Sequence, residues 1–239
     1  KGTFAVAPFK PAQHPGIRSL PFLTLDADIG AASHNLSFLD LYLERFHGMT
    51  VGGAGNLKGH LRLEKATLQP GSRLSASARE LCVDLLAHRV QGAGEIKIVV
   101  DPRAPAMTQI SIEFESLSAF PAQRRELLFW GERLTVAGKG AVALVPSEGR
   151  QTMAGDLSVT IPSVTVPDLG VYQRYLPEQW PFKLNGGQGV LRGRVALSGT
   201  RWHATLKLLS ENADVGLADY RFRSNLEVTL KASSRSLAA

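Results

Sequence analysis

The sequence predicts a mainly β protein: a long, curved antiparallel sheet, either an open trough or a sandwich, with a few short helices. Two observations predict this fold class. Apolar and polar residues alternate along many segments, which is typical of strands in a sheet that is covered on one side. A unit of one short helix followed by several strands also recurs along the 239 residues. Copies of such a unit stack, so that neighbouring copies continue one sheet and one core.

Helices are predicted at three places. Ser37 and Asp40 have the spacing of a capping box, apolar residues follow at helical intervals, and Gly48 is a typical end of a helix. A second helix is predicted over 168–176, because a proline follows it directly. A third is predicted over 122–130. All three are short, so strands make up most of the predicted fold.

The strand pattern is clearest in four segments, residues 57–63, 95–100, 191–197 and 227–231. In the first segment leucines and a glycine occupy one face, while a lysine, a histidine and an arginine point to the other. One face of each strand is therefore apolar and the other is polar, as a sheet with a single covered side requires.

A glycine-rich stretch that occurs twice is the strongest sign of a repeat. Residues 52–63, GGAGNLKGHLRL, align without gaps with residues 186–197, GGQGVLRGRVAL, and four glycines and two leucines coincide. The preceding helices match at nearly the same offset, with Asn35 aligned on Asp168, and a weaker copy occupies 134–140. We therefore expect one continuous β-rich segment made of a first unit (1–117), a partial middle unit (118–165) and a last unit (166–239).

The glycines of this stretch do not fit a nucleotide-binding loop. A dinucleotide fingerprint needs the spacing G-x-G-x-x-G between a strand and a helix. Gly53, Gly55 and Gly59 lack that last spacing, and a strand follows them. Glycines on one face of a strand indicate instead a bend, a bulge or a close approach of two backbones.

Residues that carry catalysis or bind metals are scattered. The six histidines show no metal-binding spacing, and Cys82, the single cysteine, has no obvious base beside it. The sequence therefore predicts no catalytic residues, no metal site, no cofactor and no enzymatic activity. A carbohydrate-active β enzyme is kept as a minor alternative, because its pair of carboxylates needs only spatial proximity.

The charge balance is mildly basic. Lys and Arg number 27 against 21 Asp and Glu, and the basic residues form no dense block. Binding to nucleic acid typically uses such a block, so we expect no nucleic-acid partner. No apolar run is long enough to span a bilayer.

The order of motifs resembles one family. A helix ending in Tyr-Leu, at Tyr42 and again at Tyr175, precedes G-x-G-x-L-x-G-x-L-x-L, and LQPGSRL follows over 68–74. This order is similar to the AsmA-like and TamB-like repetitive envelope proteins of Gram-negative bacteria. The resemblance implies a periplasmic segment whose parent protein is anchored in the inner membrane through a segment missing here. It further implies a bridge-like lipid carrier whose sheet has an apolar inside and a polar outside, with no catalytic residues.

From these observations we predict that the segment binds or conducts lipid acyl chains along an apolar sheet face, in phospholipid transport or outer-membrane homeostasis. The expected partners are a phospholipid or another acyl-chain ligand, and possible envelope proteins. The alternative is the same sheet with a closed core, acting as a scaffold in envelope assembly through protein contacts. The predicted lipid-binding residues are Leu57, Leu61, Leu63, Ile96, Ile98, Val142, Leu144, Leu191, Val195 and Leu197.

Overall fold

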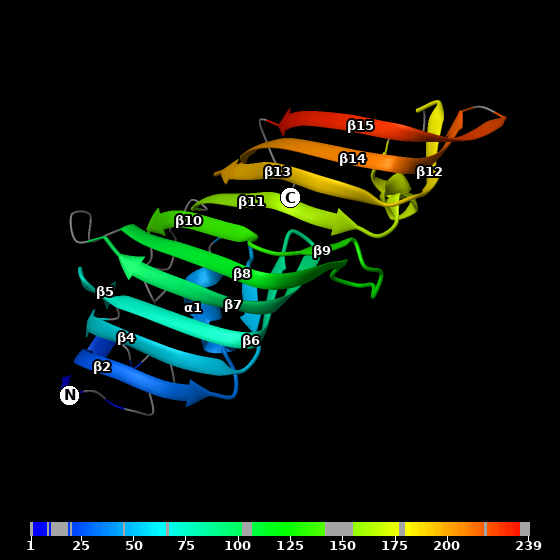
Figure 1. The fold of residues 1–239 in the computed structure, drawn as a ribbon. Coiled ribbons are helices and arrows are strands. Elements are labelled where there is room, and N and C mark those ends of the chain that lie inside the picture. The colour runs from blue at the N-terminus through cyan, green and yellow to red at the C-terminus, as the bar shows by residue number, and fades with distance from the viewer. Residues whose placement is uncertain are drawn as a thin grey trace.

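The computed structural model describes residues 2–8, 10, 19, 21–44, 46–65, 67–101, 107–141, 155–176, 180–217 and 219–234. Within these residues fifteen strands form one sheet, and Figure 1 shows it as a long, twisted ribbon of strands with the short helix behind it. The elements in chain order are β1 (Gly2–Val6), β2 (Leu23–Ser33), η3 (Ser37–Leu39), α1 (Asp40–Leu43), β3 (Thr50–Gly52), β4 (Gly55–Glu64), β5 (Thr67–Leu68), β6 (Arg73–Leu85), β7 (His88–Val100), β8 (Met107–Pro121), β9 (Phe129–Gly131), β10 (Thr135–Ala141), β11 (Asp156–Val166), η4 (Leu169–Tyr175), β12 (Phe182–Gly186), β13 (Gly189–Ser198), β14 (Arg201–Leu217) and β15 (Tyr220–Ser234).

The strands follow each other across the sheet nearly in chain order. The order is β1-β2-β4-β6-β7-β8-β10-β11-β13-β14, with β15 on the outer side of β14, and all of these neighbours are antiparallel. The short strands β3, β5, β9 and β12 pair along the ends of longer ones. The predicted fold class, a mainly β chain with a long antiparallel sheet and a few short helices, is confirmed.

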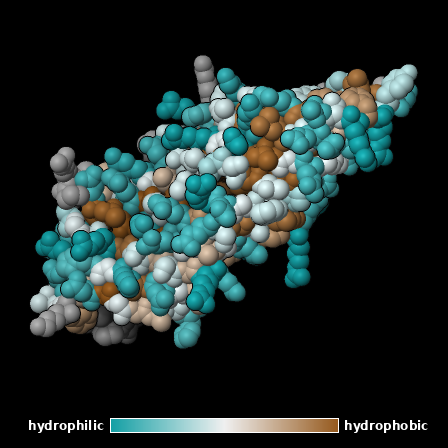
Figure 2. Space-filling view, viewed as in Figure 1, coloured by the Kyte–Doolittle hydropathy of each residue, from teal (hydrophilic) through white to brown (hydrophobic). Residues whose placement is uncertain are grey.

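One row of apolar side chains crosses the sheet from end to end. Directly opposed residues share a face, so the strand register identifies the members of the row. Ten strands from β2 to β15 contribute, in order, Ala31, Leu57, Ala76, Ile96, Ile112, Val136, Val159, Val195, Ala204 and Ala232. This face of the sheet, which we call the apolar face, carries α1. The opposite face is turned to the viewer in Figure 1, and Figure 2 shows it as mainly hydrophilic.

Strands β11 to β15, which we call the second unit, repeat the plan of strands β2 to β7, which together with β8 to β10 we call the first unit. In the first unit β4 pairs with the near half of β6 and β3 with its far half, and in the second unit β13 and β12 pair in the same way with β14. The register of β6 shifts between Ala78 and Leu81, and that of β14 shifts between Ser210 and Ala213. A bulge increases the local bend of a strand, so each long strand bends at the same place.

The repeated glycine stretch makes the same turn in both units. Gly53 has φ of +112° and Gly187 has φ of +107°, a backbone conformation that favours glycine. In each unit the carbonyl of this glycine accepts a hydrogen bond from the start of the helical segment. The Leu36 N–H donates to Gly53 over 2.9 Å, and the Leu169 N–H donates to Gly187 over 2.7 Å. The glycines therefore shape a turn that joins helix and sheet.

The helices differ in detail from the prediction. The first consists of η3 and α1, and the expected capping box is absent because Asp40 accepts a hydrogen bond from the Val51 N–H over 2.7 Å instead. The second is the 3-10 helix η4. The third prediction is wrong: residues 122–128 are irregular and 129–131 form strand β9. Backbone pairing overrides helix propensity there, since the Leu128 N–H donates to the carbonyl of Ala119.

Candidate ligand-binding face

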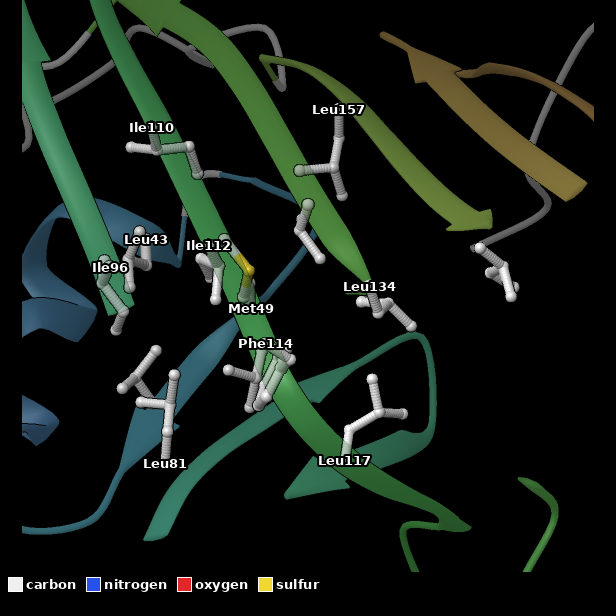
Figure 3. Close-up of a cluster of buried hydrophobic side chains, with 14 of the residues drawn as sticks. Leu43, Met49, Leu81, Ile96, Ile110, Ile112, Phe114, Leu117, Leu134 and Leu157 are labelled. Atoms are coloured by element: carbon white, nitrogen blue, oxygen red, sulfur yellow. The ribbon is translucent and has the colours of Figure 1, made fainter. Parts of the chain in front are cut away.

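The apolar face is sealed over the first unit. The segment that contains η3, α1 and the loop to β3 lies across the sheet, and its Leu43, Phe46 and Met49 are at most 1% exposed. In Figure 3 Leu43 and Met49 lie against Ile96 of β7 and Ile112 of β8. Ile96 and Ile112 are themselves at most 1% exposed. This part of the face is a closed protein core.

Glycines make room for the Phe46 ring. A Cβ on Gly155 would come within 2.6 Å of the Phe46 ring, and one on Gly138 of β10 within 3.0 Å of it. Side chains at these two positions would therefore push the ring away from the sheet. The missing side chains allow the covering segment to lie directly on β10, so the seal over the first unit depends on them.

The apolar face is more open over the second unit. The 3-10 helix η4 buries Leu169 and Val171, and β12 contributes the buried Leu184, so one end of the face is covered. Toward β14 and β15 the side chains remain partly accessible, and Leu230 is 45% exposed. The apolar residues of this region that are not fully buried form what we call the open patch. Leu230 is exposed, and the half-buried members are Val195, Leu206, Leu208, Leu226 and Val228, of which all but Val228 pack against the core on one side.

The predicted lipid-binding residues that the structure describes all lie on the apolar face, but they differ in accessibility. Leu61 and Val195 are half-buried. The others are buried, with Leu57 and Leu191 the most accessible at 9% each; the rest are Leu63, Ile96, Ile98 and Leu197. Val142 and Leu144 lie outside the described residues. The structure thus brings eight predicted residues onto one face and leaves two of those eight half-buried.

Sequence reasoning missed most of the open patch. Leu206 and Leu208 of β14 and Leu226 and Leu230 of β15 are not among the predicted residues, although they alternate with polar residues in the same way. Alternation places a residue on a face, but it does not tell which part of that face is covered. The strand register provides that information.

The polar face carries interleaved charges. Lys97 is 2.9 Å from Glu95 and Lys207 is 2.7 Å from Glu227. Such exposed pairs contribute little to stability and keep the face solvated. A shallow hollow of about 700 Å³ on this face is lined by Lys97, Lys139, Arg194 and Asp156, among others.

Titratable side chains gather on the polar face of β2 and β4, where His60 lies 3.1 Å from Asp28 and 3.4 Å from Asp26. Among the described residues no group of three or more histidine, cysteine, aspartate or glutamate side chains is placed to hold a metal ion. Burial, followed by the charge of Asp84, raises the pKa of Cys82 despite the opposing charge of Arg89, so its thiol stays protonated near neutral pH. Within the same part of the chain, none of the helices has the length and apolar character to cross a membrane.

Comparison with known proteins gives one informative match. No family model and no solved structure matches the chain. A DNA ligase from Methanosphaerula palustris is 31% identical over 103 residues, which are 41% of this chain and 18% of the ligase. The match thus spans less than a fifth of the relative's length.

This match corrects one prediction. The sequence predicts that the chain is not an enzyme, whereas the matched relative is an enzyme by name. The absence of a catalytic motif was the basis of that prediction. Motif spacing detects only sites whose residues are close in sequence, so it is a poor guide to the absence of activity.

Proposed function

We propose that the chain binds lipid acyl chains on the open patch of its second unit. The observation that carries the proposal is the difference in cover along one continuous apolar face: Ile98 of β7 is 3% exposed, whereas Leu230, at the equivalent position of β15, is 45% exposed. A folded protein rarely leaves a contiguous apolar surface uncovered unless something binds there.

The physical basis is burial of hydrocarbon. Each methylene of an acyl chain gains about 0.8 kcal/mol when it leaves water for an apolar surface. The open patch offers branched aliphatic side chains and few hydrogen-bonding groups, so it suits an alkyl chain better than a polar ligand. The family resemblance of the sequence supports the same proposal and a periplasmic location.

Lipid extraction and binding measurements test the proposal. The purified chain is extracted with organic solvent for mass spectrometry of copurified lipids, and the delipidated protein is then titrated with a fluorescent fatty acid. We expect copurified lipid and saturable binding. Absence of both would overturn the proposal.

Matched valine substitutions locate the site. Val195→Thr combined with Val228→Thr replaces two methyl groups of the open patch by hydroxyls of nearly the same shape, so affinity for the fatty acid should fall roughly tenfold. Val99→Thr is the control, because Val99 lies on the polar face and is 41% exposed. Equal effects of the double variant and the control would contradict binding on the apolar face.

A second candidate is a role in joining DNA, which the ligase match favours. The hollow on the polar face places Lys97, Lys139 and Arg194 around one carboxylate, Asp156. Lys97 is itself paired with Glu95 over 2.9 Å, so Lys139 and Arg194 supply the remaining positive charge that suits a phosphate backbone. Elsewhere on this face Lys207 is paired with Glu227, and such pairing weakens attraction to DNA.

Two assays address this candidate. Sealing of a nicked DNA duplex is measured with ATP and with NAD added in turn, and DNA affinity is measured at several salt concentrations. Sealing above the background of a Lys139→Glu variant, or DNA binding that this variant loses, would support it. A chain that neither seals nor binds DNA at low salt would exclude it.

A further inference from the structure

A strip of apolar side chains interrupts the polar face where β9, β11, β13 and β14 lie side by side. The register places Trp130 of β9 opposite Thr165 of β11, and Thr165 opposite Val190 of β13. Val190 in turn lies opposite Leu209 of β14. Thr165 stands between two buried valines of the apolar face, so the whole row is on the polar face. Trp130 is 50% exposed, and a contiguous apolar strip on a solvated face is typical of a binding surface.

A second hollow, of about 810 Å³, lies over this strip, and we call it the β14 hollow. Thr165, Val190 and Leu209 line it, and all three are half-buried. The bulge of β14 and the turn at Gly187 bound it on one side. Trp130 is one strand beyond Thr165, which is a distance of about 4.8 Å between strands. The tryptophan therefore stands at the margin of the hollow.

Hydrogen-bonding side chains line the rest of the β14 hollow. Gln188 and Asn212 each offer an amide, Glu211 offers a carboxylate and Arg192 offers a guanidinium group. All four residues are exposed, and within the described part of the chain their side chains have no hydrogen-bond or ion-pair partner. Donors and acceptors that are free to bind a ligand thus surround an apolar floor.

The first unit has a hollow of about 610 Å³ at the equivalent place, but its floor differs. Asn56 of β4 lies opposite Ser77 of β6 there, in the positions that Val190 and Leu209 occupy in the second unit. The fold therefore does not require apolar side chains at this place. Their presence on the polar face is a property of the second unit, and a ligand gives it a physical reason.

The chemistry of the β14 hollow fits a sugar. A pyranose ring has C–H groups that pack on apolar and aromatic side chains, and hydroxyls that both donate and accept hydrogen bonds. Tryptophan offers a large rigid surface for such packing, and amide, carboxylate and guanidinium groups are partners for hydroxyls. A hydrocarbon would leave Gln188 and Asn212 unused. An inorganic anion would leave the apolar floor uncovered and would meet the carboxylate of Glu211.

We propose that the β14 hollow binds an oligosaccharide, with one pyranose ring over Val190 and Leu209 and a neighbouring ring against Trp130. Few polar groups placed around an apolar floor give such a site its specificity. The site lies on the polar face, opposite the open patch, and it uses no part of the outer edge of β15. It therefore stands whether or not the apolar face takes lipid.

An array of immobilised oligosaccharides tests the proposal with the full chain, and isothermal titration calorimetry with the free form of the best-bound one measures the affinity. We expect saturable binding to a group of glycans that share one sugar. Trp130→Ala should weaken binding roughly tenfold, because a packing surface is lost. Trp180→Ala is the matched control and should leave the affinity unchanged, because Trp180 is 39% exposed and packs against Phe182, outside the hollow.

Exchange of the two floors locates the site. Val190→Asn combined with Leu209→Ser gives the β14 hollow the floor of the first unit, so the affinity should fall roughly tenfold or more. The reverse exchange, Asn56→Val combined with Ser77→Leu, is the control and should leave the affinity unchanged. Circular dichroism checks that all variants are folded. Titration with the fluorescent fatty acid separates this site from the open patch, since Trp130→Ala should not change fatty-acid affinity.

Absence of binding to every glycan of the array would overturn the proposal. Glycan binding that survives both Trp130→Ala and the exchange of the β14 floor would also overturn it, and so would equal losses in Trp130→Ala and Trp180→Ala. A fatty acid that competes with the glycan would show that the hollow takes hydrocarbon instead.

Discussion

The two units of the sheet share one strand arrangement but differ in how much of their apolar face is covered. In the first unit the segment around Phe46 crosses the apolar face and buries it, whereas η4 in the second unit covers only one end. The turn glycines, the helix-to-glycine hydrogen bonds and the strand bulges agree between the units. The strands, turns and bulges therefore repeat, whereas the covering segment does not. That segment decides whether the apolar face becomes a closed core or remains accessible.

The largest expected difference between the units concerns equivalent side chains on β7 and β15. Ile96→Ala removes a side chain that is 1% exposed, so it should lower the free energy of unfolding by about 3 kcal/mol. Val228→Ala affects a half-buried side chain and should cost less than about 1 kcal/mol. Urea unfolding of both variants measures the difference. Equal losses would mean that the second unit is as closed as the first.

The turn glycines should instead behave alike. Gly53→Ala and Gly187→Ala each force a side chain into a positive-φ backbone, so each should destabilise the fold by about 1–3 kcal/mol. Gly30→Ala is the control, because a Cβ there meets no atom within 4 Å and φ is not in the positive range. Thermal unfolding followed by circular dichroism gives the ranking. Tolerance at either turn would break the equivalence of the units.

A smaller effect is expected at the residues that open the two helical segments. The Asn35 Oδ1 accepts from the Ser37 N–H over 2.9 Å, and the Asp168 Oδ1 accepts from the Gly170 N–H over 2.8 Å. Asp168 is the N-cap of η4, so Asp168→Ala should cost about 1 kcal/mol, the usual loss for a helix cap. Asn35 precedes Leu36, the N-cap of η3, and its hydrogen bond is exposed, so Asn35→Ala should cost less than Asp168→Ala. Chemical unfolding midpoints give the ranking, and a larger loss for Asn35→Ala would contradict it.

The smallest effects are pH dependences of opposite sign. Burial raises the pKa of Asp40, although the Val51 N–H opposes it, so its contribution to stability is most favourable in acid and falls as pH rises toward the raised pKa. Hydrogen bonds from Arg221 hold the pKa of Asp214 below its ordinary range, so its contribution is lost as pH falls. Comparing Asp40→Asn and Asp214→Asn with the wild type across acidic pH should give differences of opposite slope. Parallel slopes would contradict this account.

Much of the arrangement of strands and turns can be predicted from the sequence, because it depends on residues that are close together in the chain. Alternation placed Leu57 and Val195 on one face, and the repeated glycines indicated a bend, a bulge or a close approach of two backbones rather than a nucleotide loop. In both units the aligned residues, Asn35 and Asp168, accept a backbone hydrogen bond at the start of the helical segment. These features arise from residues that are near each other in the chain.

Which parts of the apolar face are covered by other segments, and which remain accessible, could not be predicted in the same way. The packing of Phe46 against Gly138 and Gly155 joins residues about a hundred positions apart, and no local pattern encodes it. The helix predicted over 122–130 fails for the same reason, because pairing with β8 and β11 decides its conformation. The open patch emerges only once the register of β13, β14 and β15 is known.

The central claim is that a hydrocarbon ligand binds the second unit and not the first. It is tested most directly by methyl NMR of the full chain during titration with a fatty acid that carries a spin label near its tail. The account predicts selective loss of the methyl signals of Val195, Leu206 and Val228, with the signals of Ile96 and Ile112 unchanged. Unchanged signals throughout, or equal loss in both units, would contradict it.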